Sequence, residues 1–328
     1  NNLFTLCHLI YTDTFYMKRK WIRWVSWILL TPIILFVILM VLLYVPPVQN
    51  LLRREVTAYA SKATGMQIQV ERIDLRFPLN LLVRGVEVIQ QPDTLLSLES
   101  LNVRVQAWPL IKGKVEVDEV TLSRVAVNSA DLMEGMKIKG VLGRFFLQSH
   151  GVDLSNELAV INQVELSDTH VQLLMNDTTT TPKDTTASAP INWKVALHQL
   201  KLKNVSFSMQ LPADSMRMAA HIGEAAIDDA QADLKNQYYD LKKFLLSGTS
   251  ASYDTGTAQP AEGFDASHIA VRDIRIALDS LLYKGRDMNA VIREFTMNER
   301  SGLSVTSLTG RAYSNDSVIC VPGLKLNT

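Results

Sequence analysis

Cysteine is almost absent from this sequence, and the histidines are scattered. The chain has 328 residues but only two cysteines, Cys7 and Cys320, which are too few for a disulfide framework. No two histidines have the spacing that places metal ligands on one face of a helix or strand, and neither cysteine completes a zinc site. The histidines are His8, His150, His170, His198, His221 and His268. We therefore expect no disulfide and no metal centre.

Excess charge and catalytic motifs are missing as well. The 33 basic and 33 acidic residues cancel, which argues against nucleic acid as a partner. The sequence contains no G-x-S-x-G elbow, no phosphate-binding glycine loop and no G-x-G-x-x-G motif. Asp228 and Asp229 are adjacent, but neighbours in a strand point to opposite faces. We expect no enzymatic activity and no cofactor, although catalytic groups from distant positions could still meet in the fold.

One long hydrophobic run, by contrast, is present near the amino terminus. Between residues 24 and 44 only two hydroxyl residues and one proline interrupt the apolar side chains. About twenty helical residues span the hydrocarbon core of a bilayer, so this run is long enough to cross it. No small-residue cleavage site precedes the Pro46-Pro47 pair. The sequence therefore predicts a retained signal-anchor over residues 17–47 rather than a cleaved signal peptide.

Flanking charges predict the orientation of this anchor. Its amino side carries a cluster of cations, whereas the nearest cations on the other side lie beyond the proline pair: Lys18, Arg19, Lys20 and Arg23 against Arg53 and Arg54. Because cytoplasmic flanks are enriched in Lys and Arg, we expect the amino end in the cytoplasm and the bulk of the chain across the membrane. The two cysteines would then lie on opposite sides. Residues 1–16 show neither periodicity nor a targeting pattern, and we interpret them as a disordered or non-native upstream segment.

A short amphipathic helix is predicted directly after the anchor, over residues 48–65. Its apolar residues recur with the helical period, and Gly65 stands where a helix ends. These apolar residues are Val48, Leu51, Leu52, Val56, Tyr59 and Ala63. Such a helix either packs on the following domain or lies on the membrane surface.

From residue 66 onward the pattern changes to the alternation of β-strands, with one recurrent spacing. Two apolar residues separated by one residue are followed by a gap of two residues and then by a second apolar pair with the same spacing. A weaker copy of this spacing lies at residues 159–166. Since the gap shifts side-chain parity by one, both apolar pairs face one side only where the strand is bulged or sharply coiled. A solenoid with five-residue rungs is the alternative. The residues that carry the spacing are Val115, Val117, Val120, Leu122, Val195, Leu197, Leu200, Leu202, Ile269, Val271, Ile274 and Ile276.

Polar breaks divide the predicted β region into three segments. We expect a first segment over 66–175, a Thr-rich loop over 176–190, and a second segment over 191–246. A flexible loop over 247–267 and a third segment over 268–328 follow, and the third is expected to continue beyond the chain end.

The order of these features resembles the amino-terminal part of AsmA-like envelope proteins of the TamB type, as found in Bacteroidota. The resemblance is carried by "LLYVPPVQNLLRREVTAYASKATGMQIQVERIDLRFPLNLLVRGVEVI", by "DTLLSLESLNVRVQAWPLIKGKVEVDEVTLSRVAV" and by "FDASHIAVRDIRIALDSLLYKG". It implies an inner-membrane protein of the Gram-negative periplasm with a repeating β-groove. It further implies phospholipid transport between the two membranes, outer-membrane protein translocation and assembly, and an outer-membrane barrel partner that binds a carboxy-terminal region absent here.

The residues lead to the same physical hypothesis. A strand series with one apolar face must bury that face, yet the sequence shows few amphipathic helices after residue 65. An elongated, curled antiparallel sheet could turn the face inward as an open hydrophobic groove for acyl chains, lined by the twelve residues named above. Ordinary core between two packed sheets is the other interpretation of these residues. A different function, a structural tether or chaperone scaffold, would bind unfolded outer-membrane strands by β-augmentation.

Overall fold

The computed structural model describes most of the predicted β region but little of the predicted anchor. The described residues are 44–111, 116–130, 135–153, 156–175 and 192–328, together with Thr31, Ile38 and Val41. Most of the anchor expected over 17–47 and all of the Thr-rich loop expected over 176–190 lie outside them. In the described part of the chain, no helix is long and apolar enough to cross a membrane. Two compact units divide at residue 54, and the sheet belongs to the second, residues 55–328.

Helix α2, Pro46–Thr64, occupies the position predicted for the amphipathic helix. Gly65 ends it in the left-handed conformation, with a φ of 70°, and donates its N–H to the carbonyl of Ser61 at 3.0 Å. This is the geometry that favours glycine after a helix. Val56 and Tyr59, two of the predicted apolar positions, are exposed. In this part of the helix, the predicted apolar face is therefore not buried by the sheet.

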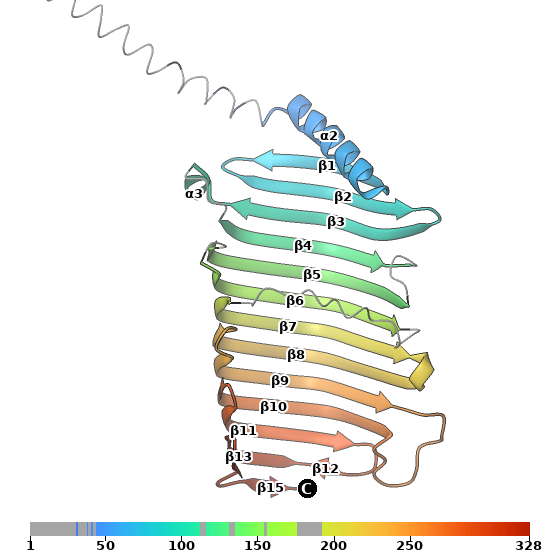
Figure 1. Cartoon of the computed structure of the whole chain (residues 1–328), viewed down its shortest axis with the longest axis vertical. Helices are drawn as coiled ribbons and strands as arrows, with labels where there is room; N and C mark the ends of the chain where they lie inside the picture. The colour runs from blue at the N-terminus through green and yellow to red at the C-terminus, as the bar shows by residue number, and fades with distance from the viewer. Residues whose placement is uncertain are drawn as a thin grey trace, which may run out of the picture. The chain divides into compact units, whose positions relative to one another are not determined.

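The rest of the described chain is mostly β and forms one fifteen-stranded sheet whose strands follow chain order (Figure 1). β12 pairs only with β11, and β15 pairs with β13. The short helix α3, Ala107–Ile111, follows β3, and a 3-10 turn, Pro212–Asp214, joins β7 to β8. The strands are β1 Gln67–Arg76, β2 Asn80–Gln90, β3 Asp93–Val105, β4 Val117–Asn128, β5 Met136–Asp153, β6 Leu158–Met175, β7 Lys194–Leu211, β8 Met216–Asp233, β9 Tyr238–Asp254, β10 His268–Lys284, β11 Asp287–Glu299, β12 Ser304–Val305, β13 Ser307–Ser314, β14 Ile319–Cys320 and β15 Lys325–Asn327.

One strand pair departs from the expected antiparallel sheet. β6 and β7 are parallel, with Leu158 opposite Lys194 and Leu174 opposite Gln210. The expectation was wrong at this pair because β7 begins at the level where β6 begins and not at the level where β6 ends. The sequence shows only a polar segment at this point, and a polar segment does not reveal where the next strand starts.

The loop expected over 247–267 is shorter than predicted. Residues 247–254 belong to β9, which pairs with β8 on one side and with β10 on the other. Their small side chains give no alternating hydrophobic pattern, but main-chain hydrogen bonds to two neighbours do not depend on that pattern. The loop therefore lies between Asp254 and His268.

Backbone irregularities lie where the apolar spacing predicted them. In β10 the register shifts between Arg272 and Arg275, and Asp273 between them has a φ of 55°. In β7 the pairing with β8 skips His198. The exposure pattern agrees with the predicted parity, because Ile269, Val271, Ile274 and Ile276 are half-buried whereas Arg272, Asp273 and Arg275 are exposed. The bulged or coiled strand predicted from the two-residue gap is confirmed in these strands.

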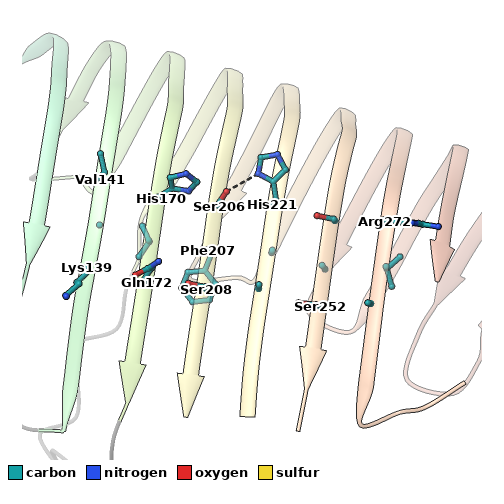
Figure 2. Close-up of a pocket in the computed structure, with 18 of the residues that line it drawn as sticks. Lys139, Val141, His170, Gln172, Ser206, Phe207, Ser208, His221, Ser252 and Arg272 are labelled. Atoms are coloured by element: carbon teal, nitrogen blue, oxygen red, sulfur yellow. Dashed lines mark hydrogen bonds between the residues drawn. The ribbon is translucent and has the colours of Figure 1, made fainter. Parts of the chain in front are cut away.

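A second set of irregularities forms a line across the sheet, which we call the crease. The registers of β1 to β8 skip one aligned position per strand: Glu71, Gly85, Glu99, Arg124, Gly143, Asp168, Asn204 and Gly223. Arg124, Asp168 and Asn204 have positive φ, of 46°, 51° and 54°. Figure 2 shows neighbouring strands bending at a common level. The bend is therefore a feature of the sheet and not of one strand.

Glycine is required at two crease positions for lack of space. A Cβ on Gly143 would lie 2.7 Å from the Cβ of Asp168, and one on Gly223 would lie 2.8 Å from the main-chain oxygen of Gly248. Both distances are shorter than a carbon atom tolerates. Neighbouring strands thus approach closely at the bend because these two residues have no side chain.

Candidate functional site: an apolar face across the sheet

Two rows of apolar side chains run across the sheet without a polar interruption from β1 to β11. We call them the apolar ladders. Each member is the register partner of the next, so the members of a ladder share one face. The first ladder is Leu75, Leu81, Val103, Val120, Leu147, Val164, Leu200, Ile227, Phe244, Leu278 and Ile292; the second is Ile73, Val83, Leu101, Leu122, Phe145, Leu166, Leu202, Ala225, Leu246, Ile276 and Phe295.

Both ladders lie on the same side of the sheet. Their members are two residues apart in every strand from β1 to β10, which places them on one face. With strands about 4.8 Å apart, ten steps make a continuous apolar strip about 48 Å long. Main-chain register alone produces this alignment, because the sequence separation between partners varies from strand to strand.

The apolar ladders are only partly covered. All members except Ala225 are half-buried, and no large side chain in the described residues is fully buried. A sheet-on-sheet core would bury such Leu, Ile and Phe side chains almost completely. Half-buried side chains of this kind are expected for a surface that no second layer covers.

Five of the predicted lining residues belong to the ladders, and the other described ones lie in different rows. Val120 and Leu200 belong to the first ladder, and Leu122, Leu202 and Ile276 to the second. The remaining described members lie in rows outside the two ladders: Val117 opposite Val105, Val195 opposite Ala159, Leu197 opposite Ile161, Ile269 opposite Tyr253, Val271 opposite Ala251 and Ile274 opposite Thr249. Val115 lies outside the described residues.

Sequence reasoning missed all of the ladder residues on β1, β2, β3, β5, β8, β9 and β11. Phe145 and Leu147, for example, pair directly with the predicted residues Leu122 and Val120. Simple alternation could have identified them, since each lies two residues from another apolar residue in a strand pattern. The recurrent two-residue gap identifies only those strands in which a backbone irregularity interrupts the apolar residues. Strands with plain alternation have no such gap and were therefore not selected.

On the opposite face, a polar row runs beside the second ladder from β1 to β9. A row one residue away contains only charged residues and serines: Arg72, Arg84, Ser100, Ser123, Arg144, Ser167, Lys203, Glu224 and Ser247. Where the strands reach the crease, polar side chains pair across it. Asn204 Nδ2 donates to Asp168 Oδ1 at 2.7 Å, and Arg124 pairs with Glu99, which raises the pKa of Arg124 through a side-chain hydrogen bond. This face is mixed, because the row between the two ladders also contains Leu82, Phe146 and Leu245.

A separate cavity of about 840 Å³ lies against β5 to β10, beyond the crease. His170, Ser206 and His221 occupy one row of register partners there, and Figure 2 shows them on neighbouring strands. Ser206 Oγ lies 2.9 Å from His221 Nδ1. The sequence separates these residues too widely for a local pattern, so only the strand register reveals their proximity.

This serine–histidine pair lacks the third group of a catalytic triad. An activated nucleophile needs an acid or amide that orients the imidazole, and among the described residues no such group contacts His221. In the same part of the chain, no three His, Cys, Asp or Glu side chains gather as metal ligands. Of the predicted lining residues, only Val271 touches the cavity.

In the described residues, the fold thus defines a class of protein with a long β-sheet that carries a continuous apolar strip on one face and a polar row beside it on the other. Comparisons with models of known protein families and with curated proteins found no match. The arguments about function therefore rest on the geometry of the sheet.

Proposed function

We propose that the protein is an inner-membrane-anchored periplasmic lipid conduit of the AsmA-like, TamB-type kind, which carries phospholipid between the inner and outer membranes. The observation that supports this most is the pair of apolar ladders, which are uninterrupted from β1 to β11 and half-exposed. In this proposal, the bends at the crease and at the two-residue gaps turn the apolar face inward as an open groove.

Acyl chains fit such a strip for energetic reasons. Each buried methylene gains about 0.8 kcal/mol relative to water, so a lipid tail prefers the strip to solvent. Successive ladder positions are Leu, Val, Ile, Phe or Ala, whose environments for a tail are similar. A lipid therefore exchanges one strand for the next with small changes in free energy and moves along the groove. Its headgroup stays in water at the open side.

The proposal includes a place in the envelope. The charges before residue 24 put the amino end in the cytoplasm and the sheet in the periplasm, with phospholipid and the inner membrane as partners. Exposed Val56 and Tyr59 suit a helix that lies on the membrane surface. Participation in outer-membrane protein assembly, through a barrel partner, belongs to the same proposal. Catalysis, a cofactor and a metal have no role in it.

The orientation of the anchor in the membrane can be tested directly. A reporter that is active only outside the cytoplasm is fused after Asn128, at the end of β4. The fusion should be active and remain in the membrane fraction. Activity in a soluble product would show that the anchor is cleaved, and activity only with a cytoplasmic reporter would reverse the orientation.

A chaperone or tether function is the second candidate, and the sheet edge favours it. β1 is an edge strand, since it pairs only with β2 among the described strands. An edge strand can pair with an added strand, which here would replace contacts such as that of the Ile68 N–H with Ser61 Oγ at 3.1 Å. In that case the cargo would be an extended peptide rather than a lipid.

Mass spectrometry of the purified full chain separates the two candidates. We expect co-purified phospholipid that decreases in the Leu200→Asp/Leu202→Asp variant and persists in the matched Lys201→Asp/Lys203→Asp variant. The amount of lipid that binds to the anchor should be the same in both variants, so it does not affect the comparison. Equal lipid content in both would contradict the conduit, and peptide in place of lipid would support the chaperone.

A further inference from the structure

The cavity against β5 to β10 differs in charge from the chain as a whole. The chain has a formal charge of zero, yet the cavity is lined by Lys139, Arg272 and Arg300 and by no Asp or Glu. The three cations of the lining give it a positive charge, although Glu299 lies beside it and accepts from the main-chain N–H of Ala270 at 3.4 Å. This cavity lies beyond the crease and is distinct from the apolar ladders.

The cations are placed at the two ends of the cavity, and short side chains lie between them. Lys139 is on β5, whereas Arg272 is on β10 and Arg300 follows β11. Five strand spacings separate β5 from β10, which is about 24 Å. The strands between them contribute mainly small or hydrogen-bonding residues to the lining: His170, Gln172, Ser206, Ser208, Ala219, Ala220, His221, Ser250, Ala251 and Ser252.

Two of the cations are available to a ligand. Lys139 and Arg272 are exposed, and neither forms an ion pair with a carboxylate in the described part of the chain. Arg300 donates Nη2 to the carbonyl of His268 at 2.8 Å, which holds its guanidinium in place. A guanidinium fixed in this way presents its remaining N–H groups in the fork that matches phosphate oxygens.

We propose that this cavity binds a phosphate-bearing ligand that lies across the strands. Arg272 and Arg300 bind a phosphoryl group at one end, and Lys139 attracts negative charge at the other. The serine hydroxyls between them donate to the ligand's oxygen atoms. This chemistry is shared by free phosphate compounds and by the headgroup of an anionic phospholipid. The site does not depend on acyl chains or on transport along the ladders.

Calorimetric titration of the full chain in a non-ionic detergent tests the proposal. Inorganic pyrophosphate is the probe for free phosphate compounds, and glycerophosphoglycerol, a headgroup without acyl chains, is the probe for lipid. We expect at least one probe to bind with a Kd below about 1 mM. The Arg272→Gln variant should weaken that binding about tenfold or more, since a probe of this size binds at the Arg272 end of the cavity and loses a charge-assisted contact there.

Arg275→Gln is the matched control, because Arg275 is an exposed arginine on the same strand that does not line the cavity. It should change the Kd less than about twofold. Binding of pyrophosphate alone assigns the site to free phosphate compounds, and binding of glycerophosphoglycerol assigns it to lipid headgroups. The proposal is overturned if neither probe binds, or if Arg272→Gln, checked for folding by circular dichroism, binds as the wild type does.

Discussion

The two faces of the same strands differ in polarity. One face carries the apolar ladders without a polar interruption, and the other carries a row of charged residues and serines one position away. In β7 the contrast lies between neighbours, with Leu202 half-buried and Lys203 exposed. A sheet that only needed stability would cover its apolar face with a second layer. In the proposed function, this open apolar face is the surface that binds the acyl chains of the lipid.

Reversing the polarity of the apolar face should have the largest effect. Leu202→Asp places a carboxylate in the middle of the second ladder, where a passing acyl chain would have to desolvate it. We expect loss of function in a complementation assay for envelope integrity. Because the site is half-exposed, the cost in folding free energy should stay near 1–2 kcal/mol, about the range found for imperfectly buried polar groups.

Lys203→Asp is the matched change on the polar face. It should complement fully and alter the free energy of unfolding by less than about 0.5 kcal/mol. Resistance to protease checks that both variants are folded. A folded Leu202→Asp protein that complements like the wild type would show that the two faces do not differ in function.

A smaller effect is expected when the close approach of strands at the crease is blocked. Gly223→Ala puts a methyl group 2.8 Å from the main-chain oxygen of Gly248, so one strand must shift. The free energy of unfolding should fall by about 1–3 kcal/mol in a urea titration.

Gly140→Ala is the control for this change, because its nearest contact would be 3.4 Å, to the main-chain oxygen of His170. It should change the free energy of unfolding by less than about 0.5 kcal/mol. Equal effects at both positions would mean that the crease has no special need for glycine.

The smallest predicted effect concerns acid. Main-chain N–H groups of Ala261 and Ser267, followed by His268, lower the pKa of Asp265. A carboxylate with a lowered pKa in the fold stabilises it above the unfolded pKa, near 3.8, and this contribution disappears as the pH falls through the folded value. Asp265→Asn should therefore reduce the loss of stability below about pH 4 in unfolding titrations. An unchanged pH profile would contradict the role of Asp265.

The sequence predicted the mostly β character and the position of the irregularities in β7 and β10, because both depend on local alternation, whereas the crease was not predicted. The two-residue gap in "HIAVRDIRI" placed the break at Arg272 and Asp273, where the structure has it. The helix end at Gly65 was also predictable from a single residue. Local signals of this kind do not need knowledge of the partners.

What could not be predicted depends on the register between strands. The parallel β6–β7 pair, the alignment of Phe145 with Leu166, and the row of His170, Ser206 and His221 all arise from how far one strand is shifted along another. Residues 247–254 were misjudged because small side chains hide a strand that is held by main-chain bonds on both sides. The cationic cavity has no sequence signal, since its members come from separate strands.

Photo-crosslinking in cells tests the central claim most directly. A photoreactive residue is placed at Leu202 on the apolar face or at Lys203 on the polar face, which are neighbours on β7. The account predicts phospholipid attached at position 202 and none at position 203. Attachment of lipid at both positions, or at neither, would contradict a groove that carries lipid along the apolar ladders.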